Sequence, residues 1–320
     1  MKKNKIKDTG LEVTELSFGT SSLGSMPDTY GYEVPEDRAQ KTLNRFFQGP
    51  VNMLDTSRNY AMGESEKRIG KAIKENGGWP NGFLLSTKLD RNMDTLVLDK
   101  NRVRESLEES LKTLNVDSVD ILFLHDPEYA KDITDITKKD GAMDELFKIK
   151  NEGLAKAAGV AMGKVDIMFP LLKDWDFDVI INHNRYTLLN REANEMYDYA
   201  SSKNIAIFNA APYAGGVLAK GPDNFKKITY QDATEEKLAP AREFEKVCKK
   251  HNVELGAAAL QFSLRDNRIT STICGVTSVE SIEKNLAWAN AEISGEFWDE
   301  VLKLPFSSND PESDRVFTAG

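Results

Sequence analysis

The stretch FLLSTKLDRNMDTLVLDKNRVRESLEESLKTLNVDSVDILFLHDP (83–127) contains two short apolar runs on either side of a helical pattern. FLLSTKL (83–89) and VDILFLHDP (119–127) have the length and the apolar content of buried strands. The segment 99–115 between them is amphipathic, and its apolar face carries Val103, Leu107, Leu111 and Leu114. The stretch therefore predicts a strand–helix–strand unit of a parallel sheet.

The same alternation extends along the chain. Apolar runs occupy 16–24, 51–57, 83–89, 119–127, 154–163, 177–183, 205–212 and 271–278. Helical patterns occupy 35–48, 64–77, 99–115, 141–152, 164–175, 190–203, 236–251 with 255–265, and 278–290. Such an alternation is typical of an open doubly wound sheet or of a closed (β/α)8 barrel. The strand count, with no composition break and no linker, favours an α/β fold with one TIM-barrel domain over 1–320.

Three local features complete the predicted fold. Residues 5–13 predict an N-terminal β-hairpin, because short alternating segments flank the turn Asp8-Thr9-Gly10. Thr277 and Glu280 predict a capping box at the start of the last helical pattern. The longest irregular stretch, 212–235, is glycine-rich and then polar, and a loop of that length in a compact domain is usually functional.

The composition argues against several classes of protein. The 320 residues include 42 Lys and Arg against 51 Asp and Glu, for a net charge of −9, and 40% are hydrophobic. The hydrophobic content argues against a disordered chain, and the acidic balance argues against nucleic acid as a partner. No run of about twenty apolar residues predicts a membrane span, and the basic start lacks the apolar segment of a secretory signal. We therefore expect a cytoplasmic protein, and it would be a monomer or a small homo-oligomer.

Cysteine and histidine usage gives no sign of a disulfide framework or a metal site. Cys248 and Cys274 are the only cysteines, and we expect both to be free structural thiols. The three histidines, His125, His183 and His251, do not have the spacing of metal ligands, so no metal is expected.

Side chains that could take part in catalysis lie at the ends of three consecutive predicted strands. Asp55 ends one run, Tyr60 follows it in the loop, Lys88 ends the next run and His125 ends the third. In a barrel, catalytic groups project from the carboxyl ends of the strands, so the four would meet at one rim. A lysine beside the phenol would lower the phenol's pKa from about 10, a carboxylate would keep the lysine charged, and an imidazole would position the substrate oxygen. This set suits reversible proton transfer at a carbonyl or hydroxyl oxygen, and hydride transfer would need an added cofactor.

The same residues match a known family. In LDTSRNY, STKL and LFLHDP they occur in the order and on the strands typical of the aldo-keto reductases, which the chain resembles over nearly its whole length. The resemblance implies a barrel that uses a soluble nicotinamide cofactor. It implies that Tyr60 is the general acid/base, that Lys88 tunes it, that Asp55 pairs with Lys88, and that His125 orients the substrate oxygen.

The resemblance also implies where the cofactor binds. PYAGGVLAKG (212–221) is similar to the family's pyrophosphate loop, and GVTS (275–278) opens a helix whose amides attract anions. Ala161-Met162, His183 and Ala210 stand where many members have a Ser-Asn pair, a glutamine and a stacking aromatic ring. The residues expected to contact the cofactor are Gly19, Thr20, His183, Asn209, Pro212, Tyr213, Gly215, Gly216, Leu218, Gly275, Thr277, Ser281 and Asn285.

Local charge favours NAD over NADP as the cofactor. Members selective for NADP often carry Lys and Arg around the last strand and the next helix. At the matching positions this chain has Gly275 and Ser281, with Glu280 between them and Lys284 one turn later. A carboxylate there would repel a 2′-phosphate, which prefers arginine or lysine.

The stretch FNAAPYAGGVLAKGP (208–222) resembles the branch that oxidises free sugars at C1, the L-fucose or D-threo-aldose type dehydrogenases. The implied function is NAD(P)-dependent hydride transfer between nicotinamide and a sugar C1 hydroxyl, or a small aldehyde or ketone. Two alternatives stay open: a nicotinamide-binding regulatory subunit with this fold, and a general carbonyl reductase that uses NADPH. Any of four tyrosines in the expected substrate loops could line the pocket: Tyr30, Tyr32, Tyr129 and Tyr213.

Overall fold

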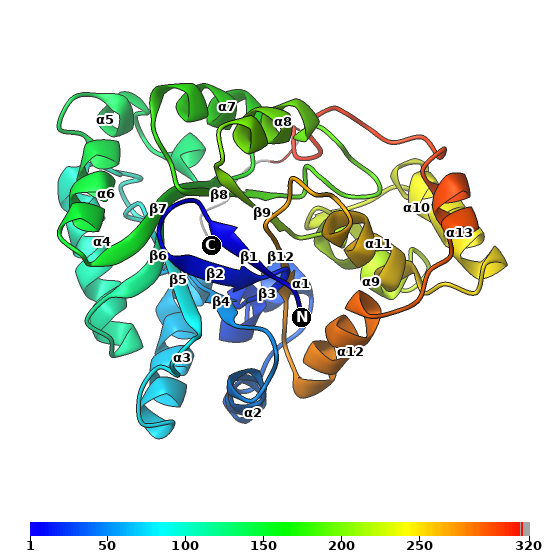
Figure 1. The fold of residues 1–320 in the computed structure, drawn as a ribbon, viewed down its shortest axis with the longest axis horizontal. Coiled ribbons are helices and arrows are strands. Elements are labelled where there is room, and N and C mark those ends of the chain that lie inside the picture. Colours follow the sequence, from blue (N-terminus) through cyan, green and yellow to red (C-terminus); the bar gives the residue numbers. More distant parts are fainter. Residues whose placement is uncertain (314, 316–320) are drawn as a thin grey trace.

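Eight parallel strands close into a barrel (Figure 1). The structure, a computed structural model, describes residues 1–313 and 315. The barrel strands are β3 (Leu16–Gly19), β4 (Met53–Asp55), β5 (Leu84–Leu89), β6 (Val119–His125), β7 (Ala155–Met162), β8 (Val179–His183), β9 (Ala206–Ala210) and β12 (Ser271–Gly275). Each pairs with the next, and β12 pairs with β3, where Thr272 lies opposite Leu16. This closure confirms the predicted (β/α)8 barrel. It excludes the open sheet, in which two edge strands would lack a partner.

Helices surround the barrel (Figure 1). The longer ones are α2 (Glu36–Phe47), α3 (Glu64–Glu75), α4 (Lys100–Leu114), α6 (Ala142–Asn151), α7 (Val165–Asp174), α8 (Asn194–Ser202), α10 (Glu235–Lys250), α11 (Leu255–Leu264), α12 (Val279–Ala289) and α13 (Gly295–Val301). All but α13 coincide with predicted helical patterns. The local reason is visible at α4, where the Asp99 carboxylate accepts from Asn101 N and Arg102 N and satisfies two amides of the first turn.

The start of α12 differs from the prediction by one residue. Ser278, and not Thr277, is the N-cap: its hydroxyl accepts from Ser281 N at 3.2 Å, and Ser281 Oγ accepts from Ser278 N at 3.0 Å. Ser278 has the extended backbone that an N-cap requires (φ −162°, ψ 167°). Glu280 therefore lies inside the first turn, and the capping box that pairs it with Thr277 is wrong.

The predicted N-terminal hairpin is present and covers the amino end of the barrel. It consists of β1 (Lys3–Ile6) and β2 (Leu11–Thr14). Its apolar side chains pack in one cluster with Met53 and Leu84, which begin β4 and β5. In Figure 1 the hairpin lies in front of the barrel strands. The carboxyl ends of the strands lie at the opposite end of the barrel.

The segment 212–235 is more ordered than predicted. It contains η4 (Ala214–Gly216), α9 (Val217–Lys220) and the short antiparallel pair β10 (Lys227–Ile228) and β11 (Gln231–Asp232). Elements of two to four residues leave no periodic pattern in a sequence, which is why this stretch was expected to be irregular.

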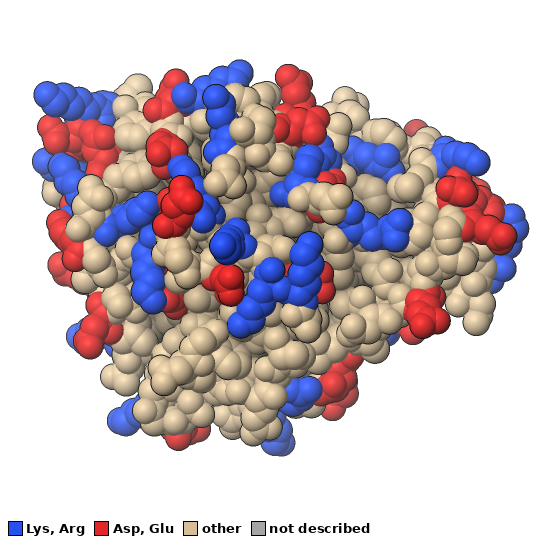
Figure 2. Space-filling model, in the orientation of Figure 1, with Lys and Arg blue, Asp and Glu red and all other residues tan. Residues whose placement is uncertain are grey.

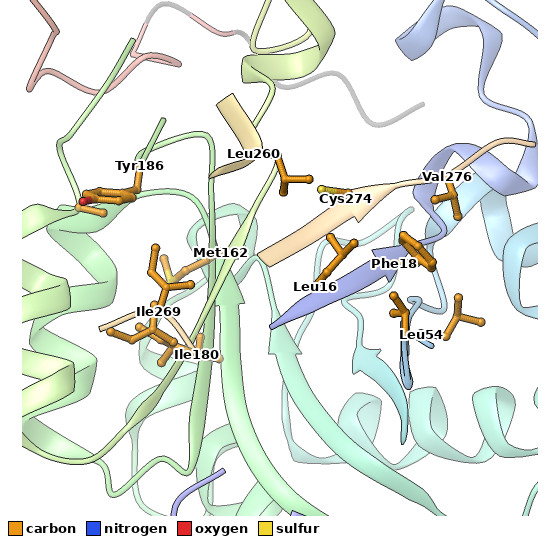
Figure 3. Close-up of a cluster of buried hydrophobic side chains, with 14 of the residues drawn as sticks. Leu16, Phe18, Leu54, Met162, Ile180, Tyr186, Leu260, Ile269, Cys274 and Val276 are labelled. Carbon is orange, nitrogen blue, oxygen red and sulfur yellow. The ribbon is translucent and has the colours of Figure 1, made fainter. Parts of the chain in front are cut away.

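Side chains along the strands alternate between the inside and the outside of the barrel. In Figure 3, Leu16 and Phe18 of β3 and Cys274 of β12 belong to the outer apolar layer between strands and helices. The inner cluster is separate and includes Ile121 and Phe123 of β6. Because the period is two, the next inward residue of β6 is His125, at the carboxyl end of the strand.

The surface carries charges of both signs. Figure 2 shows Lys and Arg interspersed with Asp and Glu on the face that carries the hairpin. Within residues 1–313 and 315, the helices are too short or too polar to cross a membrane. Cys248 and Cys274 are buried free thiols, and burial raises the pKa of each to about 12.

Gly70→Ala should destabilise the fold. A Cβ at Gly70 of α3 would lie 2.0 Å from Thr113 O of α4, a backbone atom that cannot rotate away. Alanine is otherwise favoured over glycine inside a helix by about 1 kcal/mol, so a loss of stability isolates the clash. We expect an overpacking cost of about 1–3 kcal/mol, measured as a lower Tm by circular dichroism.

Gly295→Ala is the matched control, because no atom lies within 4 Å of its added Cβ. It should melt at the wild-type temperature or slightly above. A Gly70→Ala protein as stable as this control would contradict the close approach of α3 to α4.

Candidate active site

Asp55 and Lys88 form a buried ion pair at the carboxyl ends of β4 and β5. Lys88 Nζ lies 2.8 Å from Asp55 Oδ2 and donates to Thr56 O at 2.6 Å. Ser86 Oγ donates to Asp55 Oδ1 at 3.0 Å. The Lys88 and Asp55 side chains are only 1% and 5% exposed, so both charges are held out of water. Each therefore depends on the other for compensation, since an unpaired buried charge typically costs about 3–5 kcal/mol.

Tyr60 approaches this pair from the loop after β4. It begins η2 (Tyr60–Gly63), and the Lys88 Nζ lies 4.5 Å from the centroid of its ring. The His125 ring meets the Tyr60 ring edge to face, with centroids 5.7 Å apart. The structure therefore brings all four residues of the sequence motif to one end of the barrel.

The pKa of Tyr60 is raised well above its ordinary value of 10, first by burial and then by Asp55. Burial and the nearby carboxylates therefore outweigh any lowering of this pKa by Lys88. The Lys88 ammonium donates hydrogen bonds to Asp55 and Thr56, and it lies over the Tyr60 ring. At neutral pH Tyr60 is a phenol, which donates a hydrogen bond readily and accepts a proton poorly.

Asp90 binds the far side of His125, a contact that the motif analysis missed. Its Oδ1 lies 2.6 Å from His125 Nδ1, and its Oδ2 accepts from Ser57 Oγ at 2.5 Å and from Asn59 N at 3.1 Å. Asp90 is 1% exposed. It follows Lys88 by two residues, so the alternation of the strand directs both side chains inward. That spacing is the signal in the sequence that identifies it.

His125 lies between two carboxylates. Burial lowers the pKa of His125, but Asp126 and Asp90 outweigh it, and the pKa is raised above 6.5. Asp126 Oδ1 lies 3.7 Å from His125 Nε2, beyond hydrogen-bond distance. That oxygen and Glu128 Oε2 are buried and have no hydrogen-bond partner in the described part of the chain. Burial and Asp126 raise the pKa of Glu128 to about 7. Three acidic side chains, Asp90, Asp126 and Glu128, are therefore concentrated on this wall of the mouth.

Small residues line the other half of the rim. Ala161 and Ala210 face inward at the ends of β7 and β9, and Gly19 lies opposite Gly275 where β3 meets β12. A Cβ on Gly275 would have a single neighbour within 4 Å, Ser22 Oγ at 4.0 Å. These four positions therefore place no large side chain on this half of the mouth.

His183 and Asn184 supply polar groups on the open half. Burial lowers the pKa of His183 to about 4, so the imidazole is neutral at pH 7. Asn184 Nδ2 lies 3.4 Å from His183 Nδ1, and Asn184 Oδ1 is buried without a donor among the described residues. The neutral His183 imidazole, 26% exposed beside small side chains, has the hydrogen-bonding groups to hold the carboxamide of a nicotinamide ring.

Asn209 does not face this space, and the expectation that it contacts the cofactor is wrong. Its side chain is fully buried on the outer side of β9. It donates to Tyr186 O at 3.0 Å and to Ser263 Oγ at 2.8 Å, and it accepts from Tyr197 Oη at 3.1 Å. The alternation of the strand assigns the inward position to Ala210 instead.

The loop after β9, from Pro212 onward, offers fewer free backbone amides than expected. Gly216 N and Leu218 N both donate to Tyr213 O, at 2.9 and 3.2 Å, so neither is free for a phosphate. Gly215 N has no acceptor among the described residues. A Cβ on Gly215 would lie 2.9 Å from Thr229 N, so only glycine allows the β10–β11 turn to approach this closely.

Three other expected cofactor residues hold protein groups together. Thr20 Oγ1 donates to Asp55 O at 2.9 Å and fixes the end of β4. Tyr213 Oη donates to Asn285 Oδ1, and the Tyr213 ring packs edge-on against Trp288. Thr20, Tyr213 and Asn285 therefore shape the cofactor side through these internal contacts.

The start of α12 carries mixed charge. Ser281 Oγ accepts from Thr277 N at 3.0 Å, which occupies both expected contact groups. Glu280 is exposed in the first turn. Arg38 of α2 donates to Thr277 O at 3.0 Å. Arg38 lies 239 residues from Thr277 in the sequence, so the charges near Thr277 in the sequence do not reveal it. Lys284 Nζ lies over the Trp288 ring, 4.6 Å from its centroid.

The C-terminal segment 307–313 lies against the end of β8, the loop that follows it and the β10–β11 turn. Arg185, which follows β8 and is fully buried, bonds to Asp310 at 2.6 Å and to Glu312. Glu312 Oε2 lies 4.0 Å from His183 Nδ1. The tail therefore reaches the candidate site, while residues 314 and 316–320 lie outside the described part.

Comparisons with known proteins agree with this geometry. The model of the Aldo/keto reductase family matches residues 15–304. L-Galactose dehydrogenase from Arabidopsis thaliana is 31% identical over 88% of this chain and 85% of its own length. D-Threo-aldose 1-dehydrogenase from Pseudomonas sp. is 27% identical over 92% and 94%. The solved aldo-keto reductase AKR11C1 from Bacillus halodurans superposes with a TM-score of 0.79 at 22% identity, over 99% of this chain and all of that one.

A family match over most of the chain, on a closed barrel with Asp55, Tyr60, Lys88 and His125 at its carboxyl end, is decisive. The chain belongs to the aldo/keto reductase family of NAD(P)-dependent oxidoreductases.

Proposed function

We propose that this enzyme oxidises free aldoses at C1, with NAD as the preferred cofactor. The observation that carries the proposal is the meeting of Tyr60, His125 and the Lys88–Asp55 pair beside a half-rim of small residues. The oxidised nicotinamide, when bound, accepts a hydride. His183 and Asn184 would hold its carboxamide, and the Gly215 amide and the start of α12 would meet its phosphates.

Tyr60 and His125 serve as the acid–base groups at the reacting oxygen. Their rings meet edge to face with centroids 5.7 Å apart, so both groups lie at the same place on the rim. The Lys88–Asp55 pair keeps the site polarised and dry, since both side chains are almost fully buried. Hydride transfer would occur at the carbon that bears this oxygen.

A polyhydroxylated substrate fits the acceptors of the mouth. The Asp126 side chain is 20% exposed beside His125, and its carboxylate can accept hydrogen bonds from the hydroxyl groups of a sugar. Tyr30 packs edge-on against Tyr230 of the β10–β11 turn and is a neighbour of Tyr60. Sugar rings commonly need both hydrogen-bond acceptors and aromatic surface.

Two relatives support an aldose as the substrate. One bears the name L-galactose dehydrogenase and the other D-threo-aldose 1-dehydrogenase, and each aligns over most of this chain. The cofactor preference rests on Glu280, which is exposed at the start of α12. Arg38 lies beside the same turn and opposes that preference.

Initial rates test the proposal directly. Purified enzyme would be assayed with NAD+ and with NADP+ against L-fucose, D-arabinose and L-galactose, following reduced nicotinamide at 340 nm. We expect turnover of at least one aldose and a higher kcat/KM with NAD+. Reduction of simple aldehydes with no aldose oxidation would favour the general carbonyl reductase instead.

Tyr60→Phe should cut turnover about a hundredfold or more while leaving cofactor affinity nearly unchanged. The phenol is the hydroxyl nearest the reacting oxygen, and removing such a group typically costs this much. Steady-state kcat and the quenching of protein fluorescence by cofactor measure the two effects. Unchanged turnover would remove Tyr60 from the site.

Asp126→Asn should weaken recognition of the hydroxyl next to the reacting carbon. A hydrogen bond to a charged acceptor contributes about 1.5–3 kcal/mol, so we expect kcat/KM for an aldose to fall about tenfold or more. The corresponding 2-deoxy aldose should lose much less. An equal loss for both sugars would show that Asp126 does not read this hydroxyl.

Glu280→Gln should improve the use of NADP+ relative to NAD+ by about two- to fivefold, as expected for the loss of an exposed like charge. The measurement is the ratio of kcat/KM values for the two cofactors. Glu283→Gln is the control, because Glu283 lies on the same helix and pairs with Arg45 at 2.6 Å. A ratio that moves equally in both variants would assign the preference elsewhere.

A further inference from the structure

We infer that Arg185 is a positioning residue for cofactor binding and that it acts through the C-terminal segment 307–313. The inference rests on the proposed function, in which His183, Asn184 and the Gly215 amide hold the bound cofactor. Arg185 anchors the C-terminal segment, and the segment in turn holds the end of β8 and the loop after β9 in place.

Arg185 is a buried cation whose charge is balanced mainly by the tail. Its side chain is 0% exposed, and its guanidinium donates to Glu312 Oε2 and, at 2.6 Å, to Asp310 Oδ1. A third carboxylate, that of Glu192, lies 3.8 Å from Arg185 Nε, beyond hydrogen-bond distance. Because a buried charge is stable only with a partner, the guanidinium and the two tail carboxylates hold one another in place.

The end of β7 packs against Arg185 from the other side. A Cβ on Gly163 would lie 2.4 Å from Arg185 Nη1 and 3.0 Å from His183 Cε1, so glycine lets both side chains lie against this backbone. Arg185 Nη1 also donates to His183 O at 3.3 Å. The guanidinium therefore links the tail to the backbone of the residue that would hold the carboxamide.

Glu312 brings the tail beside the His183 ring. Its Oε2 lies 4.0 Å from His183 Nδ1, and its side chain is buried. Arg315 Nη1 donates to Glu312 Oε1 at 3.0 Å, so each oxygen of this carboxylate accepts from a guanidinium. A carboxylate that is held at both oxygens keeps its position, and Glu312 therefore forms a fixed wall beside the imidazole.

The tail also contacts the turn between β10 and β11. Pro311 O lies 3.2 Å from Thr229 Oγ1, and the Arg315 guanidinium lies 5.7 Å from the centroid of the Tyr230 ring. Thr229 packs in turn against Gly215, where an added Cβ would lie 2.9 Å from Thr229 N. One residue, Thr229, therefore separates the tail from the glycine whose amide would meet a phosphate.

The backbone of this turn needs its surroundings to keep its shape. Thr229 and Tyr230 have φ values of 47° and 68°, in the left-handed region. Glycine and asparagine are the residues that suit such a turn, and a β-branched threonine is disfavoured there. A strained conformation persists only when neighbouring groups hold it. The neighbours are the tail, the Tyr30 ring 5.8 Å away, and Asn184, whose side chain hydrogen-bonds to Tyr230. Release of the tail would therefore free the turn, and the Gly215 amide with it.

Arg185→Met removes the charge and keeps an unbranched side chain. Asp310 and Glu312 lose their buried partner, so we expect the tail to leave its place and the cofactor to bind more weakly. Coupling between two sites typically changes affinity about 5- to 150-fold, and we expect the Kd values of NADH and NADPH to rise about tenfold or more. Quenching of protein fluorescence measures both. The KM for the cofactor should rise by a similar factor while kcat changes less, because Arg185 contacts β8 and the tail.

Hydrogen exchange followed by mass spectrometry reports whether the tail is in place, with no cofactor or substrate present. In the wild type Ser307 N donates to Leu189 O at 2.9 Å, and Glu312 N donates to Asp310 Oδ1 at 3.0 Å. These amides should exchange slowly. Exchange follows the population of the locally opened state, so we expect peptides that contain 307–313 to exchange about tenfold faster in Arg185→Met.

A double variant, Asp310→Asn with Glu312→Gln, tests the same link from the tail and serves if Arg185→Met does not fold. Both residues follow α13, the last helix of the described part. The double variant should reproduce the weaker cofactor binding and the faster exchange. Adding Arg185→Met to it should change both readouts little, because the three side chains act through the same bonds.

Arg104→Met is the matched control. Like Arg185, Arg104 pairs with two carboxylates, those of Glu145 and Glu152, but it does so between α4 and α6. Its cofactor affinity and its tail exchange should match those of the wild type.

Three results would overturn the inference. The first is faster tail exchange with unchanged cofactor affinity, and the second is weaker affinity with a tail that stays protected. The third is a wild-type tail that exchanges as fast as the tail of the variants. Neither readout involves a sugar. An enzyme that binds NADH or NADPH and oxidises no aldose would therefore contradict the proposed substrate and leave the role of Arg185 intact.

Discussion

The strict alternation of side chains along the eight strands governs what can meet at the mouth of the barrel. Closure through the β12–β3 pair removes every edge and fixes the register, so each strand end has one inward and one outward position. Asp55, Lys88 and His125 are inward, and the outward neighbours belong to the apolar layer under the helices. A one-residue shift of β4, β5 or β6 could replace Asp55, Lys88 or His125 at the inward position by the adjacent leucine.

The inward positions divide the mouth into two chemically different halves. The half built from β4, β5 and β6 holds buried ionic contacts, Lys88 with Asp55 and His125 with Asp90. The half built from β7, β9, β12 and β3 carries alanine and glycine at its inward positions. Buried charges tolerate little rearrangement because each is stable only with its partner. The rigid half thus suits the proton chemistry, and the open half suits a cofactor that enters and leaves.

The sequence predicted the barrel, its strands and the four residues of the motif because each of these features is periodic or local. The predictions that failed depended on side-chain direction and on long-range contacts, which local patterns do not reveal. Asn209 has an amide side chain of the kind that binds a cofactor, but it points out of the barrel, and the inward position belongs to Ala210. Leu218 N is not free for a phosphate, because it donates to Tyr213 O. Arg38 contacts Thr277 across 239 residues of sequence. Asp90 is different, because its distance of two from Lys88 was visible in the sequence and only its contact with His125 required the fold.

The pairing of β3 with β12 also determines when this molecule can become an enzyme. Residues 16–19 wait for partners at 272–275, so the ribosome must release most of the chain before the ring closes. Until then β3 presents an unpaired edge that can join another chain. The bonds of Arg185 with Asp310 and Glu312 require residues that are synthesised after β12. A nascent or truncated chain that stops before β12 would therefore retain the first strands of the site and still depend on chaperones rather than on its own core.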